Sequence, residues 1–252
     1  MTRTPGSDAL LGRLLAHRRF GLGLLSQQCE VEESELREVC RGAVPDPALL
    51  RRIALLLDLP AADLFVIAGV PVPEDLMPLD ATAGGLVVAL TRHVVLLPPD
   101  GRSRLRQYVR TLPQERRTVP VGALRSFERY PTGFGGVLLR MLANRNLGWT
   151  HSAQVFSVLT GLYVSAATIG AVGRGRVKVT HDLLRDFAVV LGFPVGDLAA
   201  MAGPVAEVGG LPARLPLQYT AGPDMAGLIR ELSRLTADQI RRVGTAAGVE
   251  LR

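Results

Sequence analysis

The sequence predicts an all-α protein in which one helical unit is written twice. Apolar residues recur at helical spacing along the chain, and no sustained strand-like alternation interrupts them. Aromatic residues make up only 5%, so the available core is built from Leu, Ala and Val. An internal repeat then relates the two halves of the 252 residues. We therefore expect two helical domains.

The repeat consists of three blocks in the same order. LGRLLAHRRF at 11–20 matches LLRMLANRNL at 138–147, which pairs Arg18 with Arg145. IALLLDLPAADLFVIAGVP at 53–71 matches FAVVLGFPVGDLAAMAGP at 187–204, which pairs Asp63 with Asp197. Residues 78–100 then match 216–238. One such match could arise by chance, but three in order indicate a duplication, with a longer middle in the second copy.

The helices of each copy can be placed from their start signals and apolar stripes. Leu11, Leu14 and Leu15 give the i, i+3, i+4 pattern of a first helix. Proline and aspartate favour the first helical turn, so Pro45-Asp46-Pro47 and Pro98-Pro99-Asp100 predict helix starts. Thr236-Ala237-Asp238 plays the same part in the second copy.

The middle of each copy carries a motif that resembles a known family. In the second copy the motif consists of Ser165, Thr168, Ile169, Val172, Arg174 and Gly175. A weaker version in the first copy consists of Val31, Ser34, Leu36, Val39, Arg41 and Gly42. The chain resembles the lambda-repressor-like (xenobiotic-response-element, or Cro) class of helix-turn-helix domains, in two tandem copies. The resemblance implies that the second helix of the motif enters the DNA major groove. Ile169 and Val172 should be buried, as should Leu36 and Val39 in the first copy, and Gly175 and Gly42 should end the motif's helix in the left-handed region.

The expected organisation follows from the repeat and the resemblance. It comprises a helix-turn-helix domain at 8–72, a helical tail at 73–112, a Pro/Gly linker at 113–135, a second helix-turn-helix domain at 136–205 and a second tail at 206–252. A short helix around 122–130 inside the linker stays open. Tails as apolar as 86–97 are expected to complete the cores or to form a homodimer.

The second copy is the expected DNA-binding half. Its recognition helix has no acidic residue, and three cations follow it closely. Thr150 is expected to cap a helix and to leave its neighbours near phosphates. The helix positions that would face bases carry only small side chains, so direct reading of bases should be poor. The predicted DNA-binding residues are Thr150, His151, Ser152, Gln154, Ser165, Ala166, Ala167, Thr168, Gly170, Arg174, Arg176 and Lys178.

The first copy is expected not to bind DNA through its motif. Carboxylates surround its recognition helix, and affinity for DNA depends on neutralising phosphates. The helix should face water or meet a basic protein surface. The predicted protein contacts are Glu32, Glu33, Glu35 and Glu38, beside Glu30.

Charge is segregated along the chain. Residues 1–75 carry eight Arg and eleven acidic residues, whereas residues 76–135 carry nine Arg and four acidic residues. The middle could attract nucleic acid or the acidic face of the first copy, including that of a second subunit. The predicted auxiliary basic patch consists of Arg102, Arg104, Arg106, Arg110, Arg116 and Arg117.

Several classes of protein are not expected. Cys29 and Cys40 lack the spacing of a metal site, and the four histidines are far apart, so we expect no metal, no cofactor and no catalytic residues. Neither 53–72 nor 86–97 is apolar enough to span a membrane. The N-terminus has no apolar signal segment, and we expect a cytoplasmic protein with reduced thiols.

Two functions remain. The net charge of +6 and the near-exclusive use of Arg are compatible with a DNA-binding transcriptional regulator that contacts double-stranded DNA through its second copy. The use of Arg in place of Lys can also reflect a GC-rich genome and then indicates nothing about a ligand. The alternative is a helix-turn-helix scaffold that has lost DNA binding and acts by protein contact, through sequestration or assembly. No residue pattern supports an enzyme.

Overall fold

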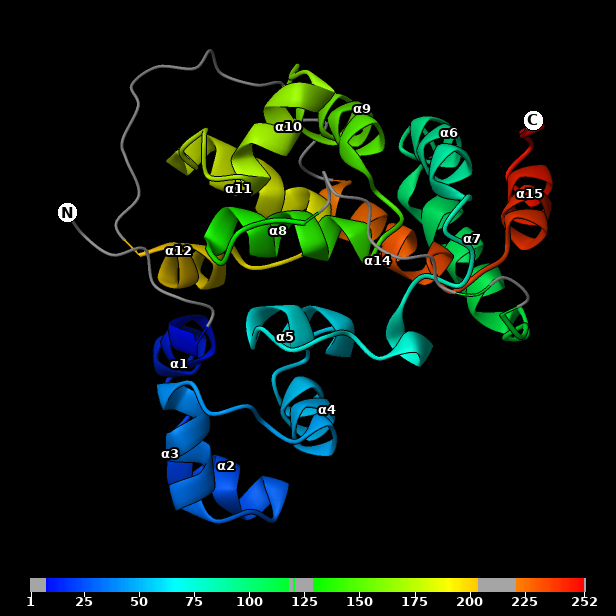
Figure 1. The fold of residues 1–252 in the computed structure, drawn as a ribbon. Coiled ribbons are helices and arrows are strands. Elements are labelled where there is room, and N and C mark those ends of the chain that lie inside the picture. The colour runs from blue at the N-terminus through cyan, green and yellow to red at the C-terminus, as the bar shows by residue number, and fades with distance from the viewer. Residues whose placement is uncertain (1–7, 118–119, 121–128, 204–220, 252) are drawn as a thin grey trace.

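The computed structural model describes residues 8–117, 120, 129–203 and 221–251, and every regular element in these ranges is helical. The all-α prediction is confirmed (Figure 1). The possible helix around 122–130 lies mostly outside the described residues, and Arg129 and Tyr130 are not helical.

The described helices form two runs of five, each followed by two more. The first run is α1 (Asp8–His17), α2 (Leu22–Cys29), α3 (Glu33–Arg41), α4 (Pro47–Leu56) and α5 (Ala61–Ile67), and a 3-10 turn η1 (Glu74–Leu76), α6 (Gly84–Val94) and α7 (Pro99–Thr111) follow. The second run is α8 (Phe134–Ala143), α9 (Trp149–Thr160), α10 (Ala166–Gly173), α11 (His181–Leu191) and α12 (Val195–Ala202), and α14 (Gly222–Leu232) and α15 (Ala237–Ala246) follow. We call 8–112 the first copy and 134–251 the second copy.

The predicted helix starts are confirmed at three places. Asp46 caps α4, and its carboxylate accepts the backbone N–H groups of Ala48 and Leu49. Pro98 and Pro99 begin α7. Thr236 forms a capping box with Gln239 at the start of α15, in which each side chain bonds to the other residue's backbone N–H.

The two copies are joined through their first and fifth helices. Helix α1 of the first copy packs against α12 of the second, and α8 of the second packs against α5 of the first. Figure 1 shows α1 beneath α12 and α5 beneath α8. The fifth helix of each copy therefore packs on the first helix of the other, as in a two-fold symmetric dimer made from one chain.

A buried ion pair fixes one side of this junction. Arg145, just past α8, binds both carboxylate oxygens of Asp63 on α5 at 3.0 and 2.7 Å. The Arg145 and Asp63 side chains are 1% and 0% exposed. Arg145 also donates to the carbonyl of Leu191 in its own copy, and Asn144 donates to Asp63 at 2.9 Å. The cross-copy pair is thus bidentate and is supported by further hydrogen bonds to both side chains, while the buried Arg145 Nε has no hydrogen-bond partner among the described residues.

The residues that the repeat pairs with these form the other side. Arg18, just past α1, binds the Asp197 carboxylate on α12 at 2.6 Å, and it donates to the carbonyl of Leu57 in its own copy. Asp197 is 4% exposed, whereas Arg18 is 20% exposed. Two ion pairs therefore hold the copies together, each joining an arginine of one copy to an aspartate of the other. The Arg145–Asp63 pair is more deeply buried than the Arg18–Asp197 pair.

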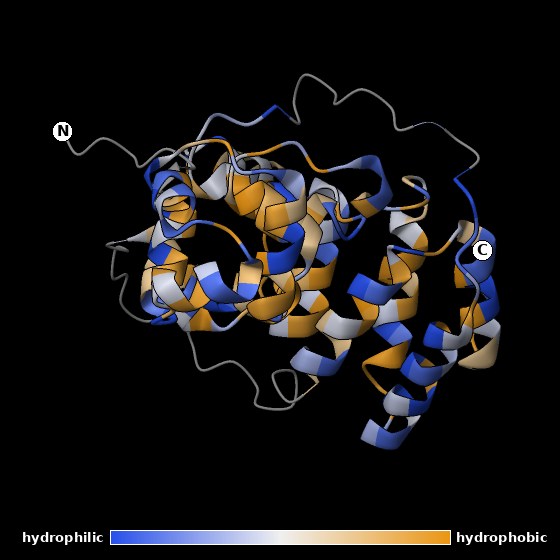
Figure 2. Ribbon diagram, turned by 90° about the horizontal axis from the view of Figure 1, so that it is seen from below, coloured by the Kyte–Doolittle hydropathy of each residue, from blue (hydrophilic) through white to orange (hydrophobic). Residues whose placement is uncertain are grey.

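The tails break this symmetry. Helix α6 packs on α9 and α14 packs on α11, so one tail helix from each copy covers the second copy. Helix α14 also packs on α6 and α7, and α15 packs on the same two helices. Apolar residues gather on the inward sides of the helices and form one continuous core (Figure 2). In this structure the tails complete the core.

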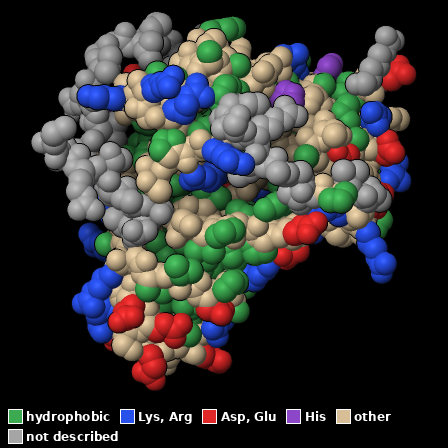
Figure 3. All heavy atoms as spheres, in the orientation of Figure 1, with side chains coloured by type: hydrophobic (Ala, Val, Ile, Leu, Met, Phe, Trp, Pro, Cys, Tyr) green, Lys and Arg blue, Asp and Glu red, His purple; other side chains and the backbone are tan. Residues whose placement is uncertain are grey.

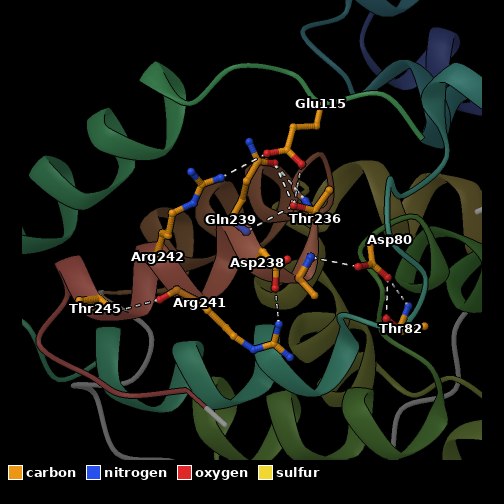
Figure 4. A network of polar contacts seen from close by, with 10 residues as sticks. Asp80, Thr82, Glu115, Thr236, Asp238, Gln239, Arg241, Arg242 and Thr245 are labelled. Atoms are coloured by element: carbon orange, nitrogen blue, oxygen red, sulfur yellow. Dashed lines mark hydrogen bonds and ion pairs between the residues drawn. The ribbon is translucent and has the colours of Figure 1, made fainter. Parts of the chain in front are cut away.

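The segment that follows α7 is tied to the second tail. The Gln239 side-chain amide donates to the carbonyl of Pro113. Glu115 accepts the Thr236 hydroxyl and pairs with Arg242 at 3.2 Å (Figure 4). Asp80 reaches the same helix start from the first copy and accepts the N–H of Ala237 at 3.0 Å. The beginning of the expected linker is therefore anchored, and its expected last residues, 134 and 135, belong to α8.

The buried pair predicts an unequal response to mutation. Asp63→Asn should lower the free energy of unfolding by about 3 to 5 kcal/mol, because it leaves the Arg145 charge buried and uncompensated. Urea denaturation followed by circular dichroism measures this loss. Asp238→Asn is the control, since Asp238 is 86% exposed beside Arg241 and should change stability by less than about 1 kcal/mol. Equal losses in the two variants would contradict the role of the pair.

Asp80 predicts a pH dependence. Burial raises the pKa of Asp80, but hydrogen bonds from the Thr82 hydroxyl and from the backbone of Ala237 and Thr82, with the charge of Arg241, outweigh burial and lower it. A carboxyl with a depressed folded pKa stabilises the fold above its unfolded pKa of about 3.9 and loses that contribution as pH falls through the folded value. The stability difference between wild type and Asp80→Asn should therefore shrink between pH 5 and pH 3. A difference that grows on acidification would contradict this assignment.

Candidate nucleic-acid interface

Helices α9 and α10 form a packed pair joined by a short turn. Helix α9 ends at Gly161, whose φ of +69° suits a residue without a side chain. Ser165 caps α10, and its hydroxyl accepts the N–H of Thr168 at 3.1 Å. Helix α9 begins at Trp149 after Gly148, so Thr150 lies inside the first turn and is not a cap. The predicted capping role of Thr150 is wrong.

The packing of α10 follows the motif. Ile169 and Val172 are buried, and Gly175 follows the helix with φ +69°. In the first copy Leu36 and Val39 are buried and Gly42 ends α3 with φ +109°. The predicted burial and the predicted left-handed glycines are confirmed in both copies.

Trp149 organises the basic end of α10. Its indole N–H donates to the Tyr130 hydroxyl at 2.6 Å, and the Arg174 guanidinium lies 4.7 Å from the centre of its ring. A cation over an aromatic face is attracted by the ring quadrupole. Arg174 is therefore held in place, while Arg176 and Lys178 project into solvent.

A shallow groove of about 520 Å³ runs along this helix pair. Its polar lining includes Thr150, Gln154 and Ser157 of α9, Tyr163 of the turn and Arg92 of α6. The remaining lining residues are Ala153, Val158, Val164 and Ala166, and none of the lining residues is acidic. The surface offers hydroxyl, amide and guanidinium donors without a carboxylate to repel an anion.

Two of the predicted DNA-binding residues are not on this surface. Ser152 is buried, and its hydroxyl donates to the carbonyl of Leu147 at 3.0 Å. Gly170 is also buried, and a Cβ built on it would lie 2.8 Å from the Trp149 ring. Both residues serve packing. The predicted residues that stay exposed or half-buried are Thr150, His151, Gln154, Ser165, Ala166, Ala167, Thr168, Arg174, Arg176 and Lys178.

The start of α9 is covered by the first tail. A Cβ built on Gly84 of α6 would lie 2.5 Å from both His151 Nδ1 and the carbonyl oxygen of Asn146. Gly84 thus lets α6 approach the beginning of α9 directly. His151 faces a helix of its own chain, so this end of α9 is less open than the resemblance implies.

Arg92 lines the groove, although the sequence alone does not indicate it. It lies on the tail helix α6, far from the motif in sequence, and it reaches the groove only because α6 packs on the opposite copy. The sequence places Arg92 in the last turn of an apolar helix, but no nearby residue indicates that it lies beside α9 and α10.

Most arginines of the predicted auxiliary basic patch form ion pairs within the chain. Arg102 pairs with Asp224, and Arg106 and Arg110 share Glu231, so three arginines of α7 fasten α14. Arg117 pairs with Glu74 at 3.3 Å and donates to nearby backbone carbonyls. Of the six predicted residues, Arg104 and Arg116 are exposed with no ion pair recorded in the described part of the chain. The patch is mainly a set of ties between the tails.

The acidic residues of the first copy lie on an open face. Glu32 caps α3, and Glu33, Glu35 and Glu38 lie exposed along the helix, where Glu33 pairs with Arg37 at 2.5 Å. Glu30 belongs to the end of α2 rather than to α3. Figure 3 shows acidic side chains gathered over α2 and α3, and basic side chains gathered over α10 and α11.

Other kinds of site are not found in the described ranges. No group of three or more His, Cys, Asp or Glu side chains there could hold a metal ion. No described helix has both the length and the apolar character needed to cross a membrane. Burial raises the pKa of the Cys29 and Cys40 thiols, which keeps them protonated and poorly reactive.

The packing of Gly170 is open to test. Gly170→Ala should lower the free energy of unfolding by about 1 to 3 kcal/mol, because the added methyl group collides with the Trp149 ring. Trp149 is the only tryptophan, so its fluorescence should report the displacement directly. Ala167→Ser on the exposed face of α10 is the matched control and should stay within about 0.5 kcal/mol of wild type. An unchanged stability and spectrum for Gly170→Ala would refute this packing.

Comparisons of the chain with protein-family models, curated proteins and solved structures find no match. Membership of the lambda-repressor-like class therefore stays a prediction from the residues.

Proposed function

We propose that the protein is a DNA-binding transcriptional regulator that contacts double-stranded DNA through its second copy. The observation that carries the proposal is the acid-free surface of α9, α10 and residues 174–178, together with Arg92. Neutralising phosphates supplies most of the affinity of a DNA-binding protein. This surface offers cations and hydroxyl donors at a helix pair of the size that fits a major groove.

The same surface predicts weak discrimination between base sequences. The outward residues of α10 include Ala166, Ala167 and Ala171, which have no hydrogen-bonding side chains. Methyl groups can contact thymine, but they cannot read the donor and acceptor pattern of a base pair. Binding should therefore depend mainly on phosphate contacts and on DNA shape.

The second candidate is a scaffold of the same helix-turn-helix type that acts by protein contact. The covering of the start of α9 by α6 favours it, because that helix end commonly lies at the phosphate backbone. The carboxylates on the exposed face of α3 favour it as well.

The test is DNA binding by the full-length protein, measured by fluorescence anisotropy with labelled genomic fragments over a salt series. The double variant Arg176→Ala/Lys178→Ala should bind DNA more weakly. Its plot of log K against log salt should also be less steep, by about 0.9 for each phosphate contact that is lost. The control variant Arg241→Ala/Arg242→Ala removes the same charge from α15, which packs on the tail helices. The control should keep the wild-type slope apart from a small long-range effect.

Two outcomes would decide against the proposal. Absence of DNA binding even at low salt would leave the scaffold as the remaining candidate. Equal losses in the two double variants would show that net charge, rather than the surface around α10, attracts the DNA.

A further inference from the structure

The surface of the second and fourth helices is covered by tail helices in the second copy and exposed in the first copy. Leu24 on α2 and His151 on α9 are equivalent, since each is the third residue after a helix-capping glycine, Gly21 or Gly148. His151 contacts Gly84 of α6. Leu24 is 49% exposed.

The fourth helices repeat this contrast. Leu55 on α4 and Val189 on α11 are equivalent, since each lies five residues before the proline that caps the fifth helix. Val189 lies against α14, where a Cβ built on Gly222 would be 2.9 Å from it. Leu55 is 82% exposed. The first copy thus exposes leucines to solvent at two positions whose equivalents in the second copy lie against tail helices.

The charge at the bare surface differs from that at the covered one. In the second copy Arg92 of α6 reaches the groove beside Thr150 and Ala166. The residue equivalent to Ala166 is Glu33, because each is the first residue after the cap of the third helix. A Cβ on Gly23, the equivalent of Thr150, would lie 3.6 Å from the Glu33 carboxylate. In the first copy, a cation at the position that Arg92 has in the second copy would meet the Glu33 carboxylate. The present partner of that carboxylate is the exposed Arg37.

We propose that the α2–α4 face of the first copy, formed by Leu24, Leu55 and Glu33, binds a pair of amphipathic helices of one partner protein, one against Leu24 and Glu33 as α6 lies on α9, and one against Leu55 as α14 lies on α11. The first of these helices would carry small residues near its N-terminus, an apolar stripe and an arginine or lysine in its last turn, as α6 does. Burial of Leu24 and Leu55 supplies the apolar contact, and the cation pairs with Glu33. This inference does not depend on DNA binding by the second copy.

The occupant comes from another protein rather than from a second copy of this chain. Among the helices that the structure describes, α6 and α14 have the required pattern, and both bury their apolar residues within the molecule. A second copy could offer them only by opening its own core. The exposed carboxylates of α3 also disfavour meeting the same face of another copy.

A peptide with the sequence of residues 82–97 is a defined probe for this face. Its N-terminus carries fluorescein, and its binding to the full-length protein is followed by anisotropy. Leu24→Ser/Leu55→Ser should weaken binding about tenfold or more, which corresponds to about 1.4 kcal/mol per factor of ten. Leu96→Ser is the matched control, because Leu96 is also 82% exposed but lies between α6 and α7. This control should bind like wild type.

A charge exchange tests the polar contact separately. Glu33→Arg should weaken binding of the native peptide, and a peptide with Arg92→Glu should bind Glu33→Arg better than it binds wild type. Displacement of the protein's own α6 from α9 could not give this exchange, since the second copy has Ala166 at the equivalent place.

Each contrary result overturns the proposal. These results are no binding of the peptide, equal binding to the Leu24→Ser/Leu55→Ser variant, or no recovery in the charge exchange. Sedimentation of the wild-type protein as a dimer that Leu24→Ser/Leu55→Ser dissociates would show that a second copy covers the face instead. Circular dichroism of each variant checks that the helices remain.

Discussion

The buried pair between Arg145 and Asp63 is the interaction on which the arrangement of the whole chain depends. A charged group in a dry interior is tolerated only when it is paired and hydrogen-bonded, so this pair admits one relative placement of α8 and α5. Its partner pair makes the reverse connection, since Arg18 after α1 donates two hydrogen bonds to one carboxylate oxygen of Asp197 on α12. With both pairs formed, the first helix of each copy packs against the fifth helix of the other. The two copies are consequently one packed body.

The tails then make equivalent copies different. Had each tail covered one copy, both α2–α4 and α9–α11 would be shielded. Instead α6 and α14 both lie on the second copy, where Gly84 and Gly222 allow the close approach. The arginines of α7 hold this arrangement by pairing with Asp224 and Glu231 of α14. The first copy is left with exposed leucines, and the second copy gains Arg92 at its groove.

Electrostatics divides the two proposed activities between the copies. The exposed glutamates of α3 would repel phosphates, whereas the surface of α10 and the cations that follow it would attract them. The bare α2–α4 face combines apolar area with a carboxylate, which suits a basic amphipathic helix. A single chain could in this way bind DNA at one end and a protein at the other.

The sequence by itself determined the helical class, the helix starts at Asp46, Pro98 and Thr236, and the left-handed glycines Gly42 and Gly175, because these depend on neighbours a few residues away. It also aligned Arg18 with Arg145 and Asp63 with Asp197, yet it gave no sign that they pair across the copies. Only the tertiary structure decided which copy the tails cover, and with it the burial of Ser152, the packing role of Gly170 and the place of Arg92. Contacts between residues distant in sequence are set by the fit of whole helices, which no local pattern records.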